Sequence, residues 1–158
     1  MKRNMKRRGF TLVELLIVIV VIGILSAMMM LSSTEAVTSA KASNIVSNLR
    51  NLKTAALAMY IDSMDKFDHG EITTVTIDKV VKYLNGGTEL ADKANYAIES
   101  NDGWYLKCTI TGTNTEKSQI RQKLAGRAAS VGLLAEAKAA SSTNVYKGAA
   151  DAVYYFVR

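Results

Sequence analysis

The sequence predicts an α+β protein in which one long N-terminal α-helix packs against a small antiparallel sheet of about three strands, with short extra helices. Three observations lead to this prediction. Residues 10–31 form an apolar run, and an amphipathic stretch without Gly or Pro continues it to Ser63. Two strand-like runs flank a hairpin turn at 100–103, and a third such run lies at 152–157. One long helix followed by short strands favours a sheet that packs on the second half of the helix.

Composition and charge exclude several classes of protein. With 49% hydrophobic residues and no proline, the 158-residue chain is neither a disordered polar chain nor a collagen-like one. Cys108 is the only cysteine and His69 the only histidine, so an internal disulfide and a multi-histidine metal site are both excluded. The net charge of +6 does not indicate nucleic-acid binding, because five residues near the N-terminus supply most of it: Lys2, Arg3, Lys6, Arg7 and Arg8.

The apolar run is long enough to span a membrane. As a helix, residues 10–31 would be about 33 Å long, which matches a hydrocarbon core of about 30 Å. The basic residues precede the run, so the positive-inside rule places the N-terminus in the cytoplasm. The run is too long and too uninterrupted for a buried core helix. A secretory signal peptide, a twin-arginine signal at Arg7-Arg8 and a plain signal anchor remain open.

Glu14 distinguishes among these alternatives. It lies four residues after Phe10, inside the apolar run, where a charged side chain costs up to about 3 kcal/mol on insertion. An acid at this place is unusual for either export signal, and a plain anchor gives it no purpose. A charged residue in a membrane span is usually paired and functional, so we expect a functional role for Glu14.

The residues around Glu14 form an ordered motif. The sequence KRRG at residues 6–9 directly precedes FTLVELLIVI at residues 10–19. This motif closely resembles the prepilin leader of type IV pilins and type II secretion pseudopilins. The resemblance covers only the N-terminal segment, and the rest of the chain carries no comparable motif.

The resemblance implies how the chain is processed. A membrane-embedded prepilin peptidase would cut between Gly9 and Phe10 on the cytoplasmic face, and the same enzyme would N-methylate Phe10. Glu14 would help the subunit to enter a growing filament, with the N-terminal amine, often that of a neighbouring subunit, as its partner. The basic residues of the leader motif are Lys6, Arg7 and Arg8.

The function implied by the resemblance is that of a structural subunit of a type IV pilus or pseudopilus. Residues 1–9 would be the leader, 10–35 the transmembrane or filament-core helix, 36–63 the amphipathic half of the same helix, and 64–158 a globular head. The precursor would be a single-pass protein of the bacterial cytoplasmic membrane. The processed subunit would lie in an extracellular or periplasmic filament.

The implied partners are other copies of the chain or other pilins, the prepilin peptidase, the filament assembly machinery and the inner membrane. No nucleic-acid partner, cofactor or metal is expected. Two alternatives belong to different classes. One is a monomeric, single-pass, membrane-anchored binding module, and the other is a twin-arginine or secretory export substrate.

Apolar residues in the second half of the helix recur at spacings of three and four, which predicts one buried face. They are Ile45, Leu49, Leu52, Ala56 and Met59, widened by Val46, Ala55 and Tyr60. We therefore expect one helix from about Phe10 to Ser63. Residues 64–76 are expected to form a solvated acidic loop, because their acids do not have the spacing of a calcium-binding loop.

The head is expected to contain two short helices and the strands. Thr76 is a candidate cap for a helix at 77–84 that stops at Asn85-Gly86-Gly87. Strands are expected at 95–99 and 104–110. A further helix at 115–124, with Thr115 as its candidate cap, is expected to stop there or to extend to Ala139.

No enzyme motif is present. The sequence has no phosphate-binding loop, no CxxC pair, no nucleophile elbow and no HExxH, so no catalytic residue is expected. Six aromatic residues are of types that can stack on bases or sugars, but we expect them to cover the sheet and inter-subunit surfaces. They are Tyr83, Tyr96, Trp104, Tyr105, Tyr154 and Tyr155.

Overall fold

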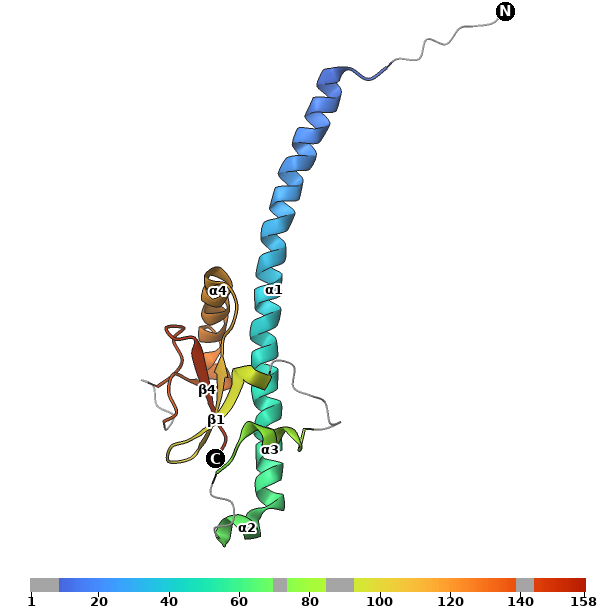
Figure 1. Ribbon diagram of the computed structural model, residues 1–158. Helices are drawn as coiled ribbons and strands as arrows, with labels where there is room; N and C mark the ends of the chain where they lie inside the picture. Colours follow the sequence, from blue (N-terminus) through green and yellow to red (C-terminus); the bar gives the residue numbers. More distant parts are fainter. Residues whose placement is uncertain (1–8, 70–73, 85–92, 139–143) are drawn as a thin grey trace, which may run out of the picture. The chain divides into compact units, whose positions relative to one another are not determined.

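The computed structural model describes residues 9–69, 74–84, 93–138 and 144–158. It confirms the α+β fold, with a long N-terminal helix, an antiparallel sheet and short helices (Figure 1). The chain divides into two units after Val37. The first unit consists of the N-terminal part of the long helix, and the second contains the rest of that helix with the sheet.

Helix α1 runs from Leu12 to Asp62, which confirms the single helix expected at about 10–63. Its sequence contains a single glycine, Gly23, and no proline, so no residue breaks the helix. From Thr38 onward one face of the helix is buried in the core of the head. The buried apolar residues of this face are Ala42, Val46, Leu49, Leu52, Ala55, Ala56 and Met59.

Within the described residues the sheet has four strands, where about three were expected. Strands β1 (Tyr96–Ser100), β2 (Trp104–Thr109) and β4 (Ala152–Phe156) lie where the sequence predicts strands. The additional strand β3 (Leu133–Leu134) pairs with β4 and completes the antiparallel order β1-β2-β4-β3. Its two residues are too few for an alternating pattern, which is why the sequence did not indicate it.

The two faces of the sheet carry separate apolar clusters. Leu106, Cys108 and Val153 belong to the main core, together with the buried face of α1. Successive side chains of a strand point to opposite faces of the sheet. On the other face, Tyr105 packs with Leu134, Ala137 and Tyr154. Both faces are therefore apolar, and the second half of α1 packs against only one of them (Figure 1).

The segment after α1 is partly helical, which corrects the prediction of a loop at 64–76. Helix α2 (Met64–Asp68) forms there, and its Phe67 packs against the core. Helix α3 (Ile77–Val81) is shorter than the predicted 77–84, and Thr76 precedes it without a side-chain capping hydrogen bond. The predicted stop at 85–87 lies outside the described residues.

Two predictions for the helix after β2 are also corrected. Helix α4 (Asn114–Ala125) begins earlier than expected, and Thr113 rather than Thr115 is its cap. The Thr113 hydroxyl accepts from the backbone of Glu116, and the Glu116 carboxylate accepts from the backbone of Thr113, so the pair forms a capping box. Helix α4 does not extend to Ala139, because helix α5 (Ala128–Val131) and β3 follow it.

Candidate functional site

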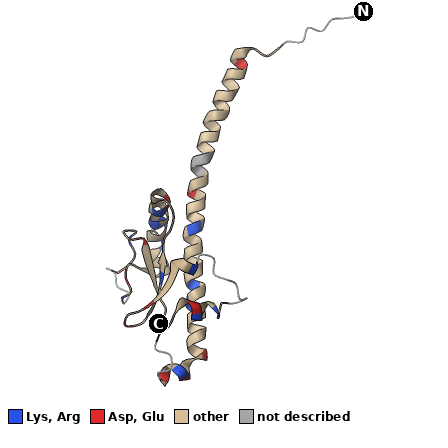
Figure 2. Ribbon diagram, in the orientation of Figure 1, with Lys and Arg blue, Asp and Glu red and all other residues tan. Residues whose placement is uncertain are grey.

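The first candidate site is the N-terminal part of α1, which is apolar on every side. The large apolar side chains from Leu12 to Met29 are about half exposed or more, so no other described residues cover this segment. Glu14 is its only charged residue before Glu35, and Figure 2 shows this part of the helix almost without charge. Among the described residues, α1 is the one helix that is long and apolar enough to cross a membrane.

Glu14 and Thr11 form a reciprocal hydrogen-bonded pair at the start of α1. The Glu14 carboxylate accepts from the Thr11 backbone N–H at 2.8 Å and from the Thr11 hydroxyl at 2.8 Å. The Glu14 N–H in turn donates to the Thr11 hydroxyl oxygen at 3.2 Å. This arrangement satisfies N–H groups that the first turn of a helix otherwise leaves unpaired.

The predicted cleavage residues lie just before this pair. Gly9 and Phe10 precede the helix, and Phe10 is 89% exposed. A Cβ built on Gly9 would meet no atom within 4 Å, so nothing in the described part of the chain requires a glycine there. The leader residues Lys6, Arg7 and Arg8 lie outside the described residues.

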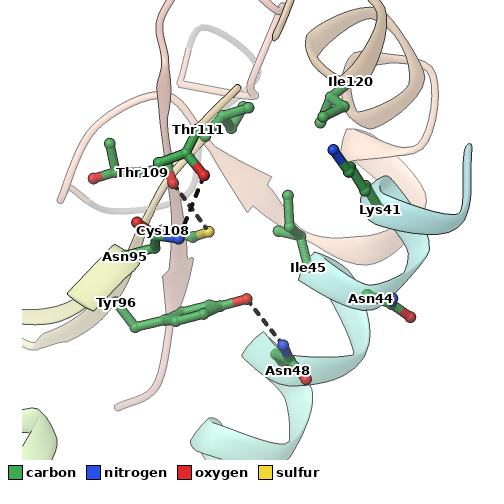
Figure 3. A pocket seen from close by; sticks show the side chains of 11 residues that line it. Lys41, Asn44, Ile45, Asn48, Asn95, Tyr96, Cys108, Thr109, Thr111 and Ile120 are labelled. Carbon is green, nitrogen blue, oxygen red and sulfur yellow. Dashed lines mark hydrogen bonds between the residues drawn. The ribbon is translucent and has the colours of Figure 1, made fainter. Parts of the chain in front are cut away.

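The second candidate site is a cavity of about 200 Å³ in the head (Figure 3), which we call the Cys108 pocket. It lies between α1, the β1–β2 strands and α4, and its polar walls include Asn44 and Asn48. Asn48 donates a hydrogen bond to the Tyr96 hydroxyl at 3.1 Å. Lys41, which also lines the cavity, forms an ion pair of 3.0 Å with Glu116.

The chemistry of the Cys108 pocket is that of a structural cavity. Burial raises the pKa of the Cys108 thiol to about 11, so the sulfur is protonated at neutral pH and is a poor nucleophile. No His, Cys, Asp or Glu residues in the described segments form a group of three that could hold a metal ion. His69 is exposed directly after α2, and its ring Nδ1 lies 2.8 Å from the Asp65 carbonyl oxygen and 3.3 Å from the Asp65 carboxylate.

Sequence reasoning missed the local role of Glu14. The pattern Thr-x-x-Glu occurs at Thr11–Glu14 and again at Thr113–Glu116, and in both places it forms the same reciprocal hydrogen bonds. A search for this spacing would have found both pairs, because a hydroxyl residue three positions before Glu is typical of a capping box. From the sequence, Glu14 was expected to be an intramembrane charge with a role in assembly, and not a cap of its own helix.

Comparison with known proteins adds one finding. A family model described as the prokaryotic N-terminal methylation motif matches residues 4–30. No curated protein and no solved structure matches the chain. The matched motif contains Gly9, Phe10 and Glu14.

The motif gives this chain the leader signature of type IV pilins and pseudopilins. It implies processing by a prepilin peptidase and supports a membrane-anchored precursor. It also favours a structural rather than an enzymatic protein. The residues that carry the signature are those at the start of α1 and directly before it.

Proposed function

We propose that the chain is a structural subunit of a type IV pilus or pseudopilus and that it polymerises through its N-terminal helix. The observation that carries the proposal is a methylation motif at 4–30 that includes the start of α1, where the helix is apolar on all sides. Such a surface is unfavourable in water and has to be covered by lipid or by other apolar helices. In the precursor the cover would be the membrane, and in the filament it would be the helices of neighbouring subunits.

The leader, residues 1–9, would be removed by cleavage between Gly9 and Phe10. Gly9 has open space around its Cα and no steric demand from its described neighbours, so the demand for glycine would come from the peptidase. The exposed position of both residues before the helix favours access by an enzyme. Lys6, Arg7 and Arg8 would keep the leader on the cytoplasmic face, where the cut is made.

Cleavage would create a cation close to Glu14. The new N-terminal amine, N-methylated, would belong to Phe10, the residue before Thr11, whose own N–H already lies 2.8 Å from the Glu14 carboxylate. A carboxylate in an apolar filament core needs an opposite charge, because burying an isolated ion is strongly unfavourable. The amine of the same chain or of a neighbouring subunit would supply that charge and set the axial register.

The remaining regions follow from this assignment. Residues 10–35 would form the span or filament core, 36–63 the part of the helix that supports the head, and 64–158 the outward-facing head. The subunit would move from the cytoplasmic membrane into an extracellular or periplasmic filament. Its partners would be other subunits, the prepilin peptidase and the assembly machinery.

The first experiment is intact mass and N-terminal sequencing of the chain from its native membrane or sheared filament fraction. We expect a chain that begins at Phe10 and carries one extra methyl group. An uncut N-terminus, or cleavage near Ala36, would contradict prepilin processing and favour the anchored module or the export substrate.

The second experiment tests assembly separately from processing. In Glu14→Gln the charge is lost while the side-chain size is kept, so we expect normal cleavage and no filaments. Glu14→Asp keeps the charge and serves as the matched control, which we expect to retain part of the assembly. Filaments formed normally by Glu14→Gln would remove the proposed role of this carboxylate.

A further inference from the structure

A groove in the head carries an inference that goes beyond filament formation. It lies where α1 ends, next to α2, the β1–β2 turn and the residues after β4, and its volume, open to solvent, is about 550 Å³. We call it the Trp104 groove. Its side chains that matter here are Tyr60, Phe67, Asp68, Asp102, Trp104 and Arg158.

One wall of the Trp104 groove is aromatic. The ring centroids of Tyr60, Phe67 and Trp104 lie 5.3 to 5.6 Å from one another, so the three rings form one continuous cluster. All three side chains are only half-buried. Two hydrogen bonds hold the backbone of Trp104. The Trp104 N–H donates to the main-chain oxygen of Arg158 at 2.9 Å, and the Trp104 carbonyl accepts from the Val157 N–H at 2.8 Å.

The same groove contains three charged side chains that have no hydrogen-bond or ion-pair partner in the described part of the chain. The Arg158 guanidinium lies 3.5 Å above the centroid of the Tyr60 ring, which orients it. Across the described segments it makes no ion pair or hydrogen bond, and neither do the carboxylates of Asp68 and Asp102. The groove thus offers an oriented guanidinium donor and two exposed carboxylate acceptors beside a half-exposed aromatic surface.

This combination fits one class of ligand best. A sugar ring has an apolar C–H face that stacks on an aromatic ring, and hydroxyl groups that both donate and accept hydrogen bonds. Carboxylates satisfy the donors of such hydroxyls and a guanidinium satisfies their acceptors. A nucleic acid fits less well, because two carboxylates against one guanidinium repel phosphates. We propose that the Trp104 groove binds a neutral saccharide.

The test uses the fluorescence of Trp104, the only tryptophan of the chain. The full chain would be purified in a zwitterionic detergent without a sugar headgroup and titrated with chitotriose, cellotriose and maltotriose. We expect a saturable change in tryptophan emission with at least one of the three. No saturable change with any of them would overturn the proposal, as would a response to an oligonucleotide alone.

Matched variants locate the binding. Arg158→Gln and Asp68→Asn each remove a hydrogen-bonding charge from the groove, and each is expected to raise the dissociation constant about tenfold. Asp65→Asn changes an acid on the same helix α2 that does not line the groove, and it is expected to bind as the parent does. If Arg158→Gln and Asp68→Asn bound the saccharide as tightly as Asp65→Asn does, the proposal would be contradicted. Asp68 is exposed and makes no described contact, so its substitution is not expected to disturb folding.

Discussion

Glu14 accepts two hydrogen bonds from Thr11, one from the backbone N–H and one from the hydroxyl, both at 2.8 Å. The carboxylate that we assign to filament assembly is therefore also part of the cap of its own helix. Within the precursor, its charge already has hydrogen-bond donors while the amine of Phe10 is still in a peptide bond. Cleavage would add an ionic partner to a carboxylate that the fold has already oriented.

The substitution Thr11→Val tests this cap. It removes the hydroxyl that accepts from the Glu14 N–H, and loss of a helix cap typically costs about 1 kcal/mol. We therefore expect the Glu14 amide hydrogen to exchange about fivefold faster in detergent-solubilised precursor. Hydrogen exchange followed by NMR measures this directly.

The control for that variant is Thr11→Ser, which keeps the hydroxyl and is expected to restore slow exchange. The same exchange rate in the parent, Thr11→Val and Thr11→Ser would show that the cap does not form. A difference confined to Thr11→Val would support it.

The cap at the start of α4 predicts a dependence of stability on pH. Hydrogen bonds from Thr113, followed by the hydrogen bond and charge of Lys41, hold the pKa of Glu116 below its ordinary value of 4.5. A carboxyl group whose pKa is lower in the folded than in the unfolded state stabilises the fold when ionised. This contribution is present above pH 4.5 and is lost as the pH falls through the folded-state pKa.

Urea unfolding followed by Trp104 emission, above and below pH 4.5, measures this effect. We expect the parent to lose stability on acidification more than Glu116→Gln, which has no carboxyl group to protonate. Lys41→Gln removes the ion pair but keeps the Thr113 cap, so an intermediate pH dependence is expected. An identical pH profile in the parent and Glu116→Gln would disprove the assignment.

Long patterns and special residues made much of the fold predictable from the sequence. The absence of proline and the spacing of Leu49 and Leu52 indicated the long helix and its buried face, and Gly103 marked the hairpin turn. The short elements β3 and α2 were missed, because their two and five residues carry no periodicity. Their structure depends on contacts with distant residues, such as that of Phe67 with Trp104.

The candidate sites also differed in how far the sequence predicts them. The motif around Gly9 and Glu14 is continuous in sequence, so it was recognised without a structure. The Trp104 groove is assembled from segments separated by dozens of residues, and no pattern in the sequence indicates that Tyr60 lies beside Arg158. Sites built by tertiary packing cannot be found from spacing alone.

Cys108 is predicted to be chemically inert in the folded chain. Burial raises the pKa of its thiol from 9.0 to about 11, which lowers the thiolate fraction near neutral pH by about 100-fold. Labelling with iodoacetamide should therefore be at least about 100-fold slower in the native than in the urea-unfolded chain, and the single cysteine makes the assignment unambiguous. Because the folded-state pKa is raised, stability should also fall between about pH 9 and pH 11. Equal labelling rates would contradict the buried position.

Gly103 in the β1–β2 turn is predicted to tolerate no side chain. Its φ is +141°, a conformation that L residues rarely adopt, and an added Cβ would lie 2.6 Å from the Arg158 carbonyl oxygen. That oxygen also accepts from the Trp104 N–H, so Gly103→Ala has to disturb the hydrogen bond between Trp104 and Arg158, which both line the Trp104 groove. We expect a loss of about 2 kcal/mol in the free energy of unfolding.

The matched control is Gly126→Ala, at the end of α4. There φ is −63° and the nearest atom lies 3.7 Å away, so a change within about 0.5 kcal/mol is expected. Equal stability of the two variants in urea unfolding would show that the turn does not require glycine, whereas a selective loss in Gly103→Ala would tie the hairpin to the groove.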